Sequence, residues 1–456
     1  MWAQRGVCFS VGGEASGAGR SGSVMTPVLP PGLAKAPLEW DDGSPPMKPT
    51  SPQDTGHRSE HEFLMHAAGH LNAYGTPAHR LERVLGKLAE SLEVEARFFS
   101  TPTSVMASFG SGGNERVHMA RTEPGEVNLG KLVEFDEVLE AVEHGQLDVL
   151  TGIERLDQVA ESGPRYGAKL VCLAFAVASA GAARLFGGGW AEMIGSALLG
   201  AFVYLTCRAL GQRSDSTGTV EPIAAFMAAL AAMLLARFAL AMDAHLVTLA
   251  ALIVLLPGLT LTVGMIELST RHLVAGTARL ARAGVVFLTI LFGVGLAWKL
   301  LEVLMPGALY VPEIKPLAPW TAALAVLPLP IAFAILFDAR PSEWPVIFAA
   351  STTGYLASEL GASYLSLDIA PFVGALVVGL VGNFYARTAD RPALVAITPG
   401  ILVLVPGSIG FRSLTSFLES GVVEGMDGAF RTGFVAISLV CGLLASNLVL
   451  PPRRIL

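Results

Sequence analysis

Three Pro-Gly pairs stand inside apolar segments of the chain, at Pro257-Gly258, Pro399-Gly400 and Pro406-Gly407. Proline removes a backbone donor and clashes with the preceding helical turn, and glycine tolerates non-helical dihedral angles, so the pairs predict kinked or unwound helices. The freed backbone groups need partners, which in an apolar environment requires that the break be buried in protein or line a wet cavity. Such breaks are typical of ligand-binding sites, and a purely structural kink is the alternative.

Hydroxyl side chains stand close to these breaks. The candidate substrate-binding positions are the three Pro-Gly pairs together with Thr260, Thr262, Thr398 and Ser408. The N-terminal end of a half-helix attracts a carboxylate, and free carbonyls accept from an ammonium group, so the pattern suits a small zwitterion. Each hydroxyl can also bond to a carbonyl of its own helix, which would be a structural role.

Charged residues within or beside apolar segments need a reason, because a charge is costly there. The candidates for proton coupling or gating are Glu192, Glu267, Arg282, Asp338, Glu359 and Arg431. None of the four carboxylates stands out, and a side chain that snorkels to the interface or faces a loop is the alternative for each.

Three histidines between residues 61 and 70 raise the question of a metal site. His61-Glu62 followed by His66 is similar to a zinc-protease helix, but the second histidine comes one residue too late for the required face. His66 and His70 share a helix face and could hold a metal, but we favour a solvated or partly buried face. We therefore predict no enzyme, no catalytic residue, no metal and no cofactor.

Composition places the chain in a lipid bilayer. Of 456 residues, 52% are hydrophobic and only 15% are charged, which is too apolar for an ordinary soluble protein. The net charge of -7, with no basic stripe, argues against a nucleic-acid partner. Three of the four cysteines, Cys172, Cys207 and Cys441, lie in apolar segments, so we expect inert packing and no disulfide framework.

The first 165 residues differ from the rest. Residues 1–56 are rich in Gly, Pro and Ser without apolar periodicity, so we expect disorder, and they show no signal-peptide pattern. Residues 57–165 predict a small soluble α+β domain. We expect helices at 62–74, 77–92, 129–144 and 149–161, and strands at 96–99, 104–109 and 116–121.

The remaining sequence predicts a polytopic α-helical membrane protein of about ten spans. The apolar blocks are 167–187, 189–210, 220–241, 244–266, 277–303, 318–337, 344–362, 367–386, 393–412 and 428–450. Arginines concentrate in the loops on one side of these blocks and acidic residues on the other, so both termini are expected in the cytoplasm.

A shift of 149 positions aligns the membrane region with itself. Seven rare residues then coincide: Pro222 with Pro371, Pro257 with Pro406, Gly258 with Gly407, Gly276 with Gly425, Arg282 with Arg431, Gly284 with Gly433, and Gly293 with Gly442. Each unit, 166–310 and 311–456, would hold five spans. An odd number inverts the second unit, giving a 5+5 inverted repeat, which is typical of carriers that expose one site alternately to the two sides.

The helix from Leu64 to Gly75 followed by Thr76-Pro77, the run Ser100 to Ser104, and the segment Ile397 to Ser408 resemble the threonine/serine exporter family, over about residues 60–450. The resemblance implies a multi-pass protein of the plasma (inner) membrane with a cytoplasmic N-terminal domain. It further implies proton-driven export of threonine and serine, so the expected partners are a small amino acid, protons and the lipid bilayer.

A channel, or a membrane sensor with a regulatory domain, remains the alternative function. A channel would show rings of like charge or a filter sequence, and neither is clear. Whether the chain forms a homo-oligomer is left open by the sequence.

Overall fold

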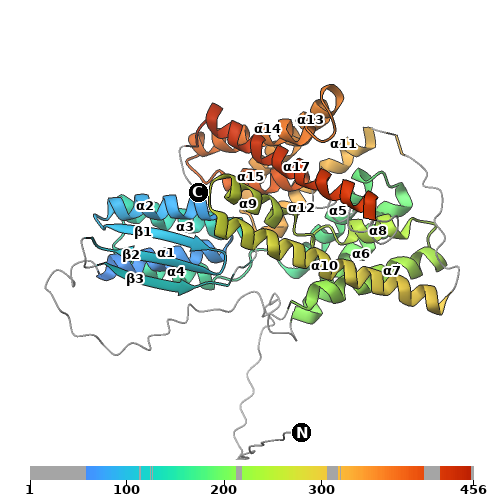
Figure 1. Cartoon of the computed structure of the whole chain (residues 1–456), viewed down its shortest axis with the longest axis horizontal. Coiled ribbons are helices and arrows are strands. Elements are labelled where there is room, and N and C mark those ends of the chain that lie inside the picture. Colours follow the sequence, from blue (N-terminus) through green and yellow to red (C-terminus); the bar gives the residue numbers. More distant parts are fainter. Residues whose placement is uncertain are drawn as a thin grey trace, which may run out of the picture.

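In the computed structural model, the described residues are 58–111, 115–123, 125, 127–211, 218–305, 317–318, 320–404 and 422–452. The predicted disordered segment 1–56 and the candidate residues Pro406, Gly407 and Ser408 lie outside these ranges. The fold combines an N-terminal α+β region with a larger body of apolar helices (Figure 1).

The described residues of the N-terminal region form four helices and one sheet. The elements are α1 (Arg58–Ala73), α2 (Ala78–Ser91), β1 (Ala96–Thr101), β2 (Ser104–Phe109), β3 (Arg116–Arg121), α3 (Leu129–Glu143) and α4 (Val149–Glu161). The strands form an antiparallel sheet in the order β1-β2-β3. The predicted helices and strands of this region are therefore confirmed, with ends that differ by a few residues.

Alternation of side chains explains how this sheet is covered. In β2, Val105, Ala107 and Phe109 are buried in the core, whereas Met106 faces outward. Leu81, Leu85 and Leu88 form the buried stripe of α2, as the helical spacing predicts. The sheet therefore packs one face against the helices and leaves the other exposed.

Among the described residues, six helices are long and apolar enough to cross a membrane: α5 (Ala168–Leu185), α6 (Trp190–Gly211), α7 (Val220–Phe238), α10 (Leu273–Leu304), α14 (Ala370–Thr388) and α17 (Val422–Val449). The others of the body are α8 (Ala244–Ala251), α9 (Gly258–Ser269), α11 (Trp320–Val326), α12 (Leu329–Leu336), the short η1 (Pro341–Glu343), α13 (Trp344–Tyr364) and α15 (Leu394–Leu404). The chain is thus a mostly helical membrane protein.

The block at 318–337 is not the single uninterrupted helix that a span of this length would suggest. It is divided into α11 and α12, and Pro328 stands at the N-cap of α12 with Pro330 in its first turn. Proline lacks the backbone donor that a continuous helix needs, so the helix restarts after Leu327.

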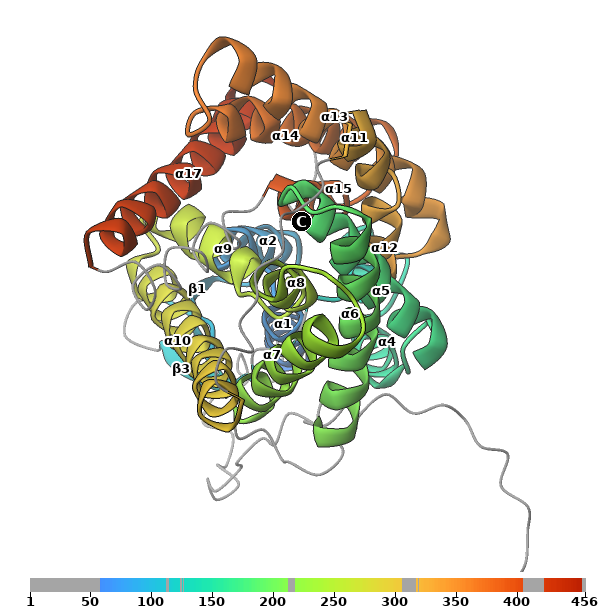
Figure 2. The ribbon, with the colours of Figure 1, turned by 90° about the vertical axis from the view of Figure 1, so that its right-hand side faces the viewer.

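The N-terminal region packs against one end of the helical body. Ala334, Ala339, Ile347 and Val395 of the body belong to the same buried cluster as Phe63 and the rest of the N-terminal core. Figure 2, which looks along the body, shows α5–α10 and α11–α17 beside one another with the N-terminal elements behind. We call this end of the helical body the near end.

Helix directions follow from these contacts. α10 starts at the near end, where His272 contacts Glu82, and α7 runs parallel to it, since Pro222 lies by Gly293 and Met233 packs with Leu301. α7 and α10 therefore run away from the near end.

The corresponding pair of the second half runs the other way. The end of α14 reaches the N-terminal core through Tyr385, and α17 ends beside it, since Arg387 Nε donates to the Pro451 carbonyl. Asn383 of α14 likewise donates to the Leu450 carbonyl. α14 and α17 therefore run toward the near end.

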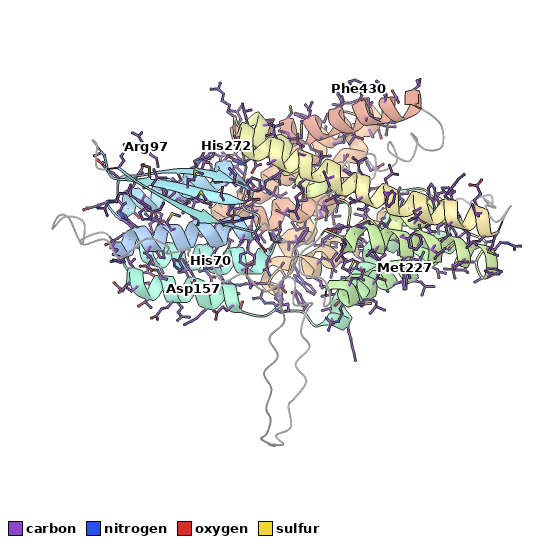
Figure 3. The ribbon with its side chains drawn as sticks, turned by 60° about the horizontal axis from the view of Figure 1, so that its bottom comes forward. His70, Arg97, Asp157, Met227, His272 and Phe430 are labelled. Atoms are coloured by element: carbon purple, nitrogen blue, oxygen red, sulfur yellow. The ribbon has the colours of Figure 1, made fainter. Side chains whose placement is uncertain are left out.

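The outside of the helical body is apolar. Met227 of α7 and Phe430 of α17 are both exposed, and Figure 3 shows them on the outer helices. Large exposed apolar side chains over several long helices are expected where the solvent is lipid.

Candidate functional site

The span that carries Pro257 is broken, as predicted. α8 ends at Ala251, turns follow, and α9 begins at Gly258 with Pro257 as its N-cap. Pro257 has φ -78° and ψ 42°, outside helical values. The break therefore interrupts the backbone ladder within the helical body.

Two threonines of α9, Thr260 and Thr262, differ in how deeply they are buried. Thr262 is fully buried and donates to the Gly258 carbonyl over 3.0 Å, so it satisfies one of the backbone groups at the break. Thr260 is half-buried one turn from Pro257. Thr260 is thus the more accessible of the two predicted binding residues.

The described part of the second Pro-Gly segment is helical. α15 continues through Pro399, and Thr398 beside it is buried. A Cβ added at Gly400 would lie 2.7 Å from Cγ1 of Val378, so this glycine allows α14 to approach closely. α15 is therefore helical at Pro399-Gly400, and the predicted break at Pro406-Gly407 lies outside the described residues.

The two Pro-Gly segments lie side by side. Val254, in the break, shares an apolar cluster with Leu402 and Val403, which end α15. Ile266 of α9 packs against the cluster that contains Ile401. The structure therefore brings the predicted binding residues of α9 and α15 into one neighbourhood, from segments about 140 positions apart.

Glu267, at the end of α9, is the most constrained of the predicted charged residues. Its carboxylate is fully buried and accepts from Arg279 Nε at 3.1 and 3.0 Å. It also accepts from the backbone N–H of Ala78 at 2.9 Å. Because the N-cap of α2 is Pro77, which has no capping side chain, Glu267 supplies that cap from the helical body.

Other side chains gather around this contact. His272 Nε2 lies 3.3 Å from Glu82 Oε2, and Glu82 also accepts from the Ser100 N–H at 2.9 Å. Burial, aided by Arg80 and His272, lowers the pKa of His79 to about 3, so this imidazole is neutral at ordinary pH. We call Ala78, His79, Glu82, Glu267, His272 and Arg279 the α2 junction.

A second contact joins α3 to the near end. Asp338 accepts from Asn128 Nδ2 at 3.0 Å and from the Arg165 N–H at 2.9 Å, and has a φ of 54°. Glu137 pairs with Arg340 at 2.8 and 2.9 Å and with Arg391. The guanidinium of Arg340 is the main cause of a Glu137 pKa lowered to about 2.

The remaining charged candidates do not meet the α2 junction. Glu192 is buried and accepts from the N–H groups of Gly189 and Asp243 at 2.8 and 3.1 Å, so it caps α6 and ties it to α8. Arg282 and Glu359 are exposed, and Arg431 pairs with Asp368 at 2.6 Å. Sequence reasoning missed His79 and Glu82 of the α2 junction, because neither lies in an apolar segment.

An apolar pocket opens elsewhere. It has a volume of about 320 Å³ and lies between α7 and α10, lined by Pro222, Val285, Leu288, Thr289 and Phe292. None of these is a predicted site residue, and the apolar lining fits a lipid-facing surface better than a zwitterion site.

A broken apolar helix in a body of membrane-length helices is typical of membrane transport proteins. The family model described as "Putative threonine/serine exporter" matches residues 62–301, more than half of the chain. The model described as "Threonine/Serine exporter, ThrE" matches residues 322–449. The chain belongs to the threonine/serine exporter family, with both modules in one polypeptide, which confirms the resemblance.

Curated relatives cover most of the chain. Pheromone-regulated membrane protein 10 of Eremothecium gossypii is 28% identical over 418 residues, which is 86% of this chain and 56% of that protein. The protein of that name from Saccharomyces cerevisiae is 30% identical over 373 residues, 79% of this chain and 48% of the relative. The chain thus spans about half the length of these relatives. No solved structure matched the chain at comparable significance.

Proposed function

We propose that the chain is a secondary active transporter that exports small amino acids, threonine and serine, from the cytoplasm in exchange for protons. Membership of the exporter family supports the substrate class. The observation that carries the proposal is the broken α8–α9 span packed against α15, because broken helices at the centre of a membrane body offer backbone groups to a zwitterion.

An inverted repeat of five and five spans would provide alternating access. α7 and α14, which the shift of 149 positions matches, run in opposite directions relative to the near end, and so do α10 and α17. Gly293 lets α10 approach the Pro222 carbonyl of α7, and the matched Gly442 lets α17 approach the Phe372 carbonyl of α14. Similar packing in opposite orientation supports two exchangeable halves.

Ten crossings follow if the interrupted pairs count as spans. The four added to the six long helices are the pairs α8–α9 and α11–α12, the single helix α13, and the predicted block 393–412, of which the structure describes α15. We propose the units 57–165, 166–310 and 311–456. The near end carries Arg271, Arg279, Arg340, Arg387 and Arg391, which supports a near end that faces the cytoplasm. The membrane itself is proposed to be the plasma membrane.

The α2 junction is proposed as the cytoplasmic gate. Glu267 joins the α9 side of the binding region to the start of α2, so movement of α9 requires that this contact change. Protonation of Glu267 would weaken both its pair with Arg279 and its cap on α2. This makes Glu267 our leading proton-coupling residue, ahead of Glu192, Asp338 and Glu359.

Counterflow in proteoliposomes tests the function. Vesicles loaded with unlabelled threonine should accumulate labelled threonine transiently, and an imposed pH gradient should drive net movement. Passive flux without exchange would favour a channel instead. Threonine binding without any flux would favour a sensor. Either of these outcomes would overturn the proposal.

A further inference from the structure

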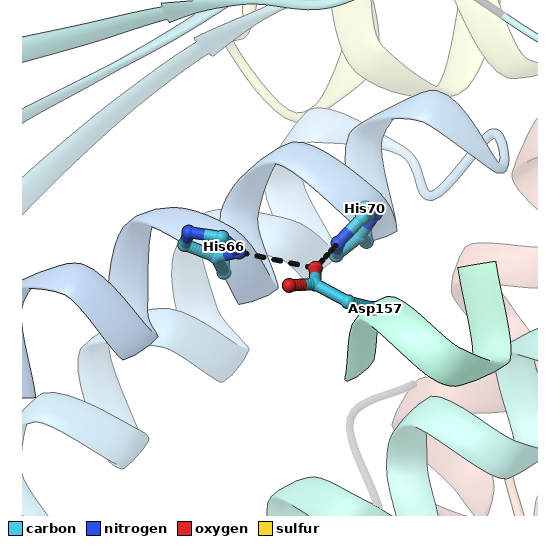
Figure 4. A group of neighbouring side chains, drawn as sticks. All are labelled: His66, His70 and Asp157. Carbon is cyan, nitrogen blue, oxygen red and sulfur yellow. Dashed lines mark hydrogen bonds and ion pairs between the residues drawn. The ribbon is translucent and has the colours of Figure 1, made fainter. Parts of the chain in front are cut away.

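Two histidines and one aspartate converge in the N-terminal region, away from the α2 junction. His66 and His70 come from neighbouring turns of α1, and Asp157 comes from α4 (Figure 4). Nδ1 of His66 lies 3.2 Å, and Nε2 of His70 lies 2.9 Å, from the same oxygen, Oδ1 of Asp157. All three ligand atoms lie within 4.8 Å of one another.

We propose that His66, His70 and Asp157 bind one divalent transition-metal ion of the zinc type. A tetrahedral ion with ligands at about 2.0–2.1 Å holds its ligand atoms about 3.4 Å apart, close to the separations from Asp157. Imidazole with one carboxylate suits zinc, and three protein ligands leave a fourth position for water.

The surroundings hold the three groups in place. The ring of His70 stacks on Phe135 of α3, with centroids 5.5 Å apart and planes 11° apart, which fixes its orientation. The two histidine side chains are 12% and 13% exposed, whereas Asp157 is 43% exposed, so the ion would be reached from the Asp157 side.

One nearby cation must be accommodated. Lys131 lies close enough to influence His70, but its ammonium group donates to Tyr74 Oη at 3.0 Å and to the Ala160 carbonyl at 2.7 Å. It is thereby held by two partners of its own.

The sequence favoured a plain helix face for His66 and His70, because Asp157 is 87 residues beyond His70 and could not be seen to join them.

Because α4 leads into α5, the first long apolar helix, a bound ion would tie the N-terminal core to the segment entering the membrane. Metal binding is coupled to folding, so binding should stabilise the α1–α4 contact specifically. This role is independent of the transport proposal, and either can fail without the other.

Purified full-length protein, treated with chelator and dialysed, should be titrated with Co²⁺ and then Zn²⁺. We expect one Co²⁺ per chain with the absorption bands of four-coordinate cobalt, displaced by Zn²⁺, which also raises Tm. Asp157→Asn and His70→Gln should each weaken binding by about tenfold or more, whereas His144→Gln, which changes an exposed histidine at the C-cap of α3, should not.

The wild-type titration decides the matter even if a variant fails to fold. Absence of stoichiometric Co²⁺ binding to the wild type would overturn the proposal and leave His66–Asp157–His70 as a hydrogen-bonded trio. Binding that survives both Asp157→Asn and His70→Gln unchanged would also overturn it, because the ion would then lie elsewhere.

Discussion

Glu267 completes the first turn of a helix that belongs to a different part of the fold. Ala78, whose N–H it accepts, is 189 residues away along the chain. A charge buried this completely is retained only where it is paired and hydrogen-bonded, and Glu267 has both a guanidinium and a helix N-terminus. Its burial therefore depends on the N-terminal region being docked.

Glu267→Gln should abolish most threonine exchange and destabilise the protein by about 2–4 kcal/mol, because it leaves Arg279 buried without its counter-charge. Counterflow and thermal unfolding in detergent measure the two effects. Glu302→Gln is the control, since Lys299 and Glu302 form an exposed pair expected to contribute at most about 0.5 kcal/mol. If Glu267→Gln exchanges threonine at the wild-type rate, Glu267 is not part of the gate.

Glu137 makes the α3 contact sensitive to acid. Its pKa falls from an ordinary 4.5 to about 2 in the folded protein, mainly through Arg340. The carboxylate therefore stabilises the fold fully above about pH 4.5, and this contribution is lost as pH falls toward 2. The protection factors of the α3 amides, which divide out the intrinsic pH dependence of exchange, should fall over this window in the wild type, whereas in Glu137→Gln they should already be lower at pH 7 and lack this acid-dependent step.

Residue-level reasoning from the sequence reaches only chemistry that is local. Glu267 was a candidate because a carboxylate in an apolar segment needs a reason, but Ala78, Arg279 and His79 could not be assigned to it. Asp338 was likewise a candidate, although its partners Asn128 and Arg165 come from another part of the chain. Long-range partners depend on docking, which spacing does not reveal.

Helices and strands were predicted best where the periodicity of apolar residues agrees with the positions of turn residues and prolines. The N-terminal strands and the break at Pro257 match because turn residues, alternation and proline act locally. The split at Pro328 and the intact helix through Pro399 do not follow from the presence of proline alone. Proline position within a helix, and the packing around it, decide between a break and a tolerated residue.

The break between α8 and α9 can be tested by repairing it. Pro257→Ala with Gly258→Ala restores a backbone donor and favours a continuous helix, so threonine exchange should fall by about tenfold or more while Tm is kept or raised. Pro345→Ala is the control, because Pro345 stands in the first turn of α13, where a donor is not required. If the repaired protein exchanges threonine normally, the break is only a structural kink.

Four glycines that the shift of 149 positions matches provide a packing test. Gly293→Ala and Gly442→Ala should each destabilise by about 1–3 kcal/mol, because an added Cβ meets the backbone of α7 or α14. Gly284→Ala and Gly433→Ala have nothing within 4 Å and should be neutral or stabilise by up to about 1 kcal/mol. Thermal unfolding of the four variants checks this, and different behaviour within a matched pair would count against equivalent halves.

At the scale of the molecule, the near end joins the two halves through the N-terminal region. The α2 junction holds α9 and α10 of the first half, while α3 contacts Asp338, Arg340 and Arg391 of the second. A rearrangement of one half against the other must therefore pass through this region. If the proposed transport cycle holds, we expect the N-terminal region to restrain this rearrangement.

A topology map tests this arrangement. Reporter fusions after Thr388 and before Val220 should both report the cytoplasm, because α14 ends and α7 begins on the same side in an inverted arrangement. Reporters on opposite sides would place α7 and α14 in the same direction and remove the basis for symmetry exchange.

The most direct test of alternating access is side-specific labelling of the binding region. Single cysteines would be placed at Thr260 or Thr398 in a variant whose four native cysteines are replaced. Each variant would be treated with an impermeant maleimide in right-side-out and in inside-out vesicles. We predict labelling from one side at a time, shifted by a pH gradient and reduced by threonine. Simultaneous labelling from both sides, indifferent to threonine, would contradict a carrier with its site at the α8–α9 break.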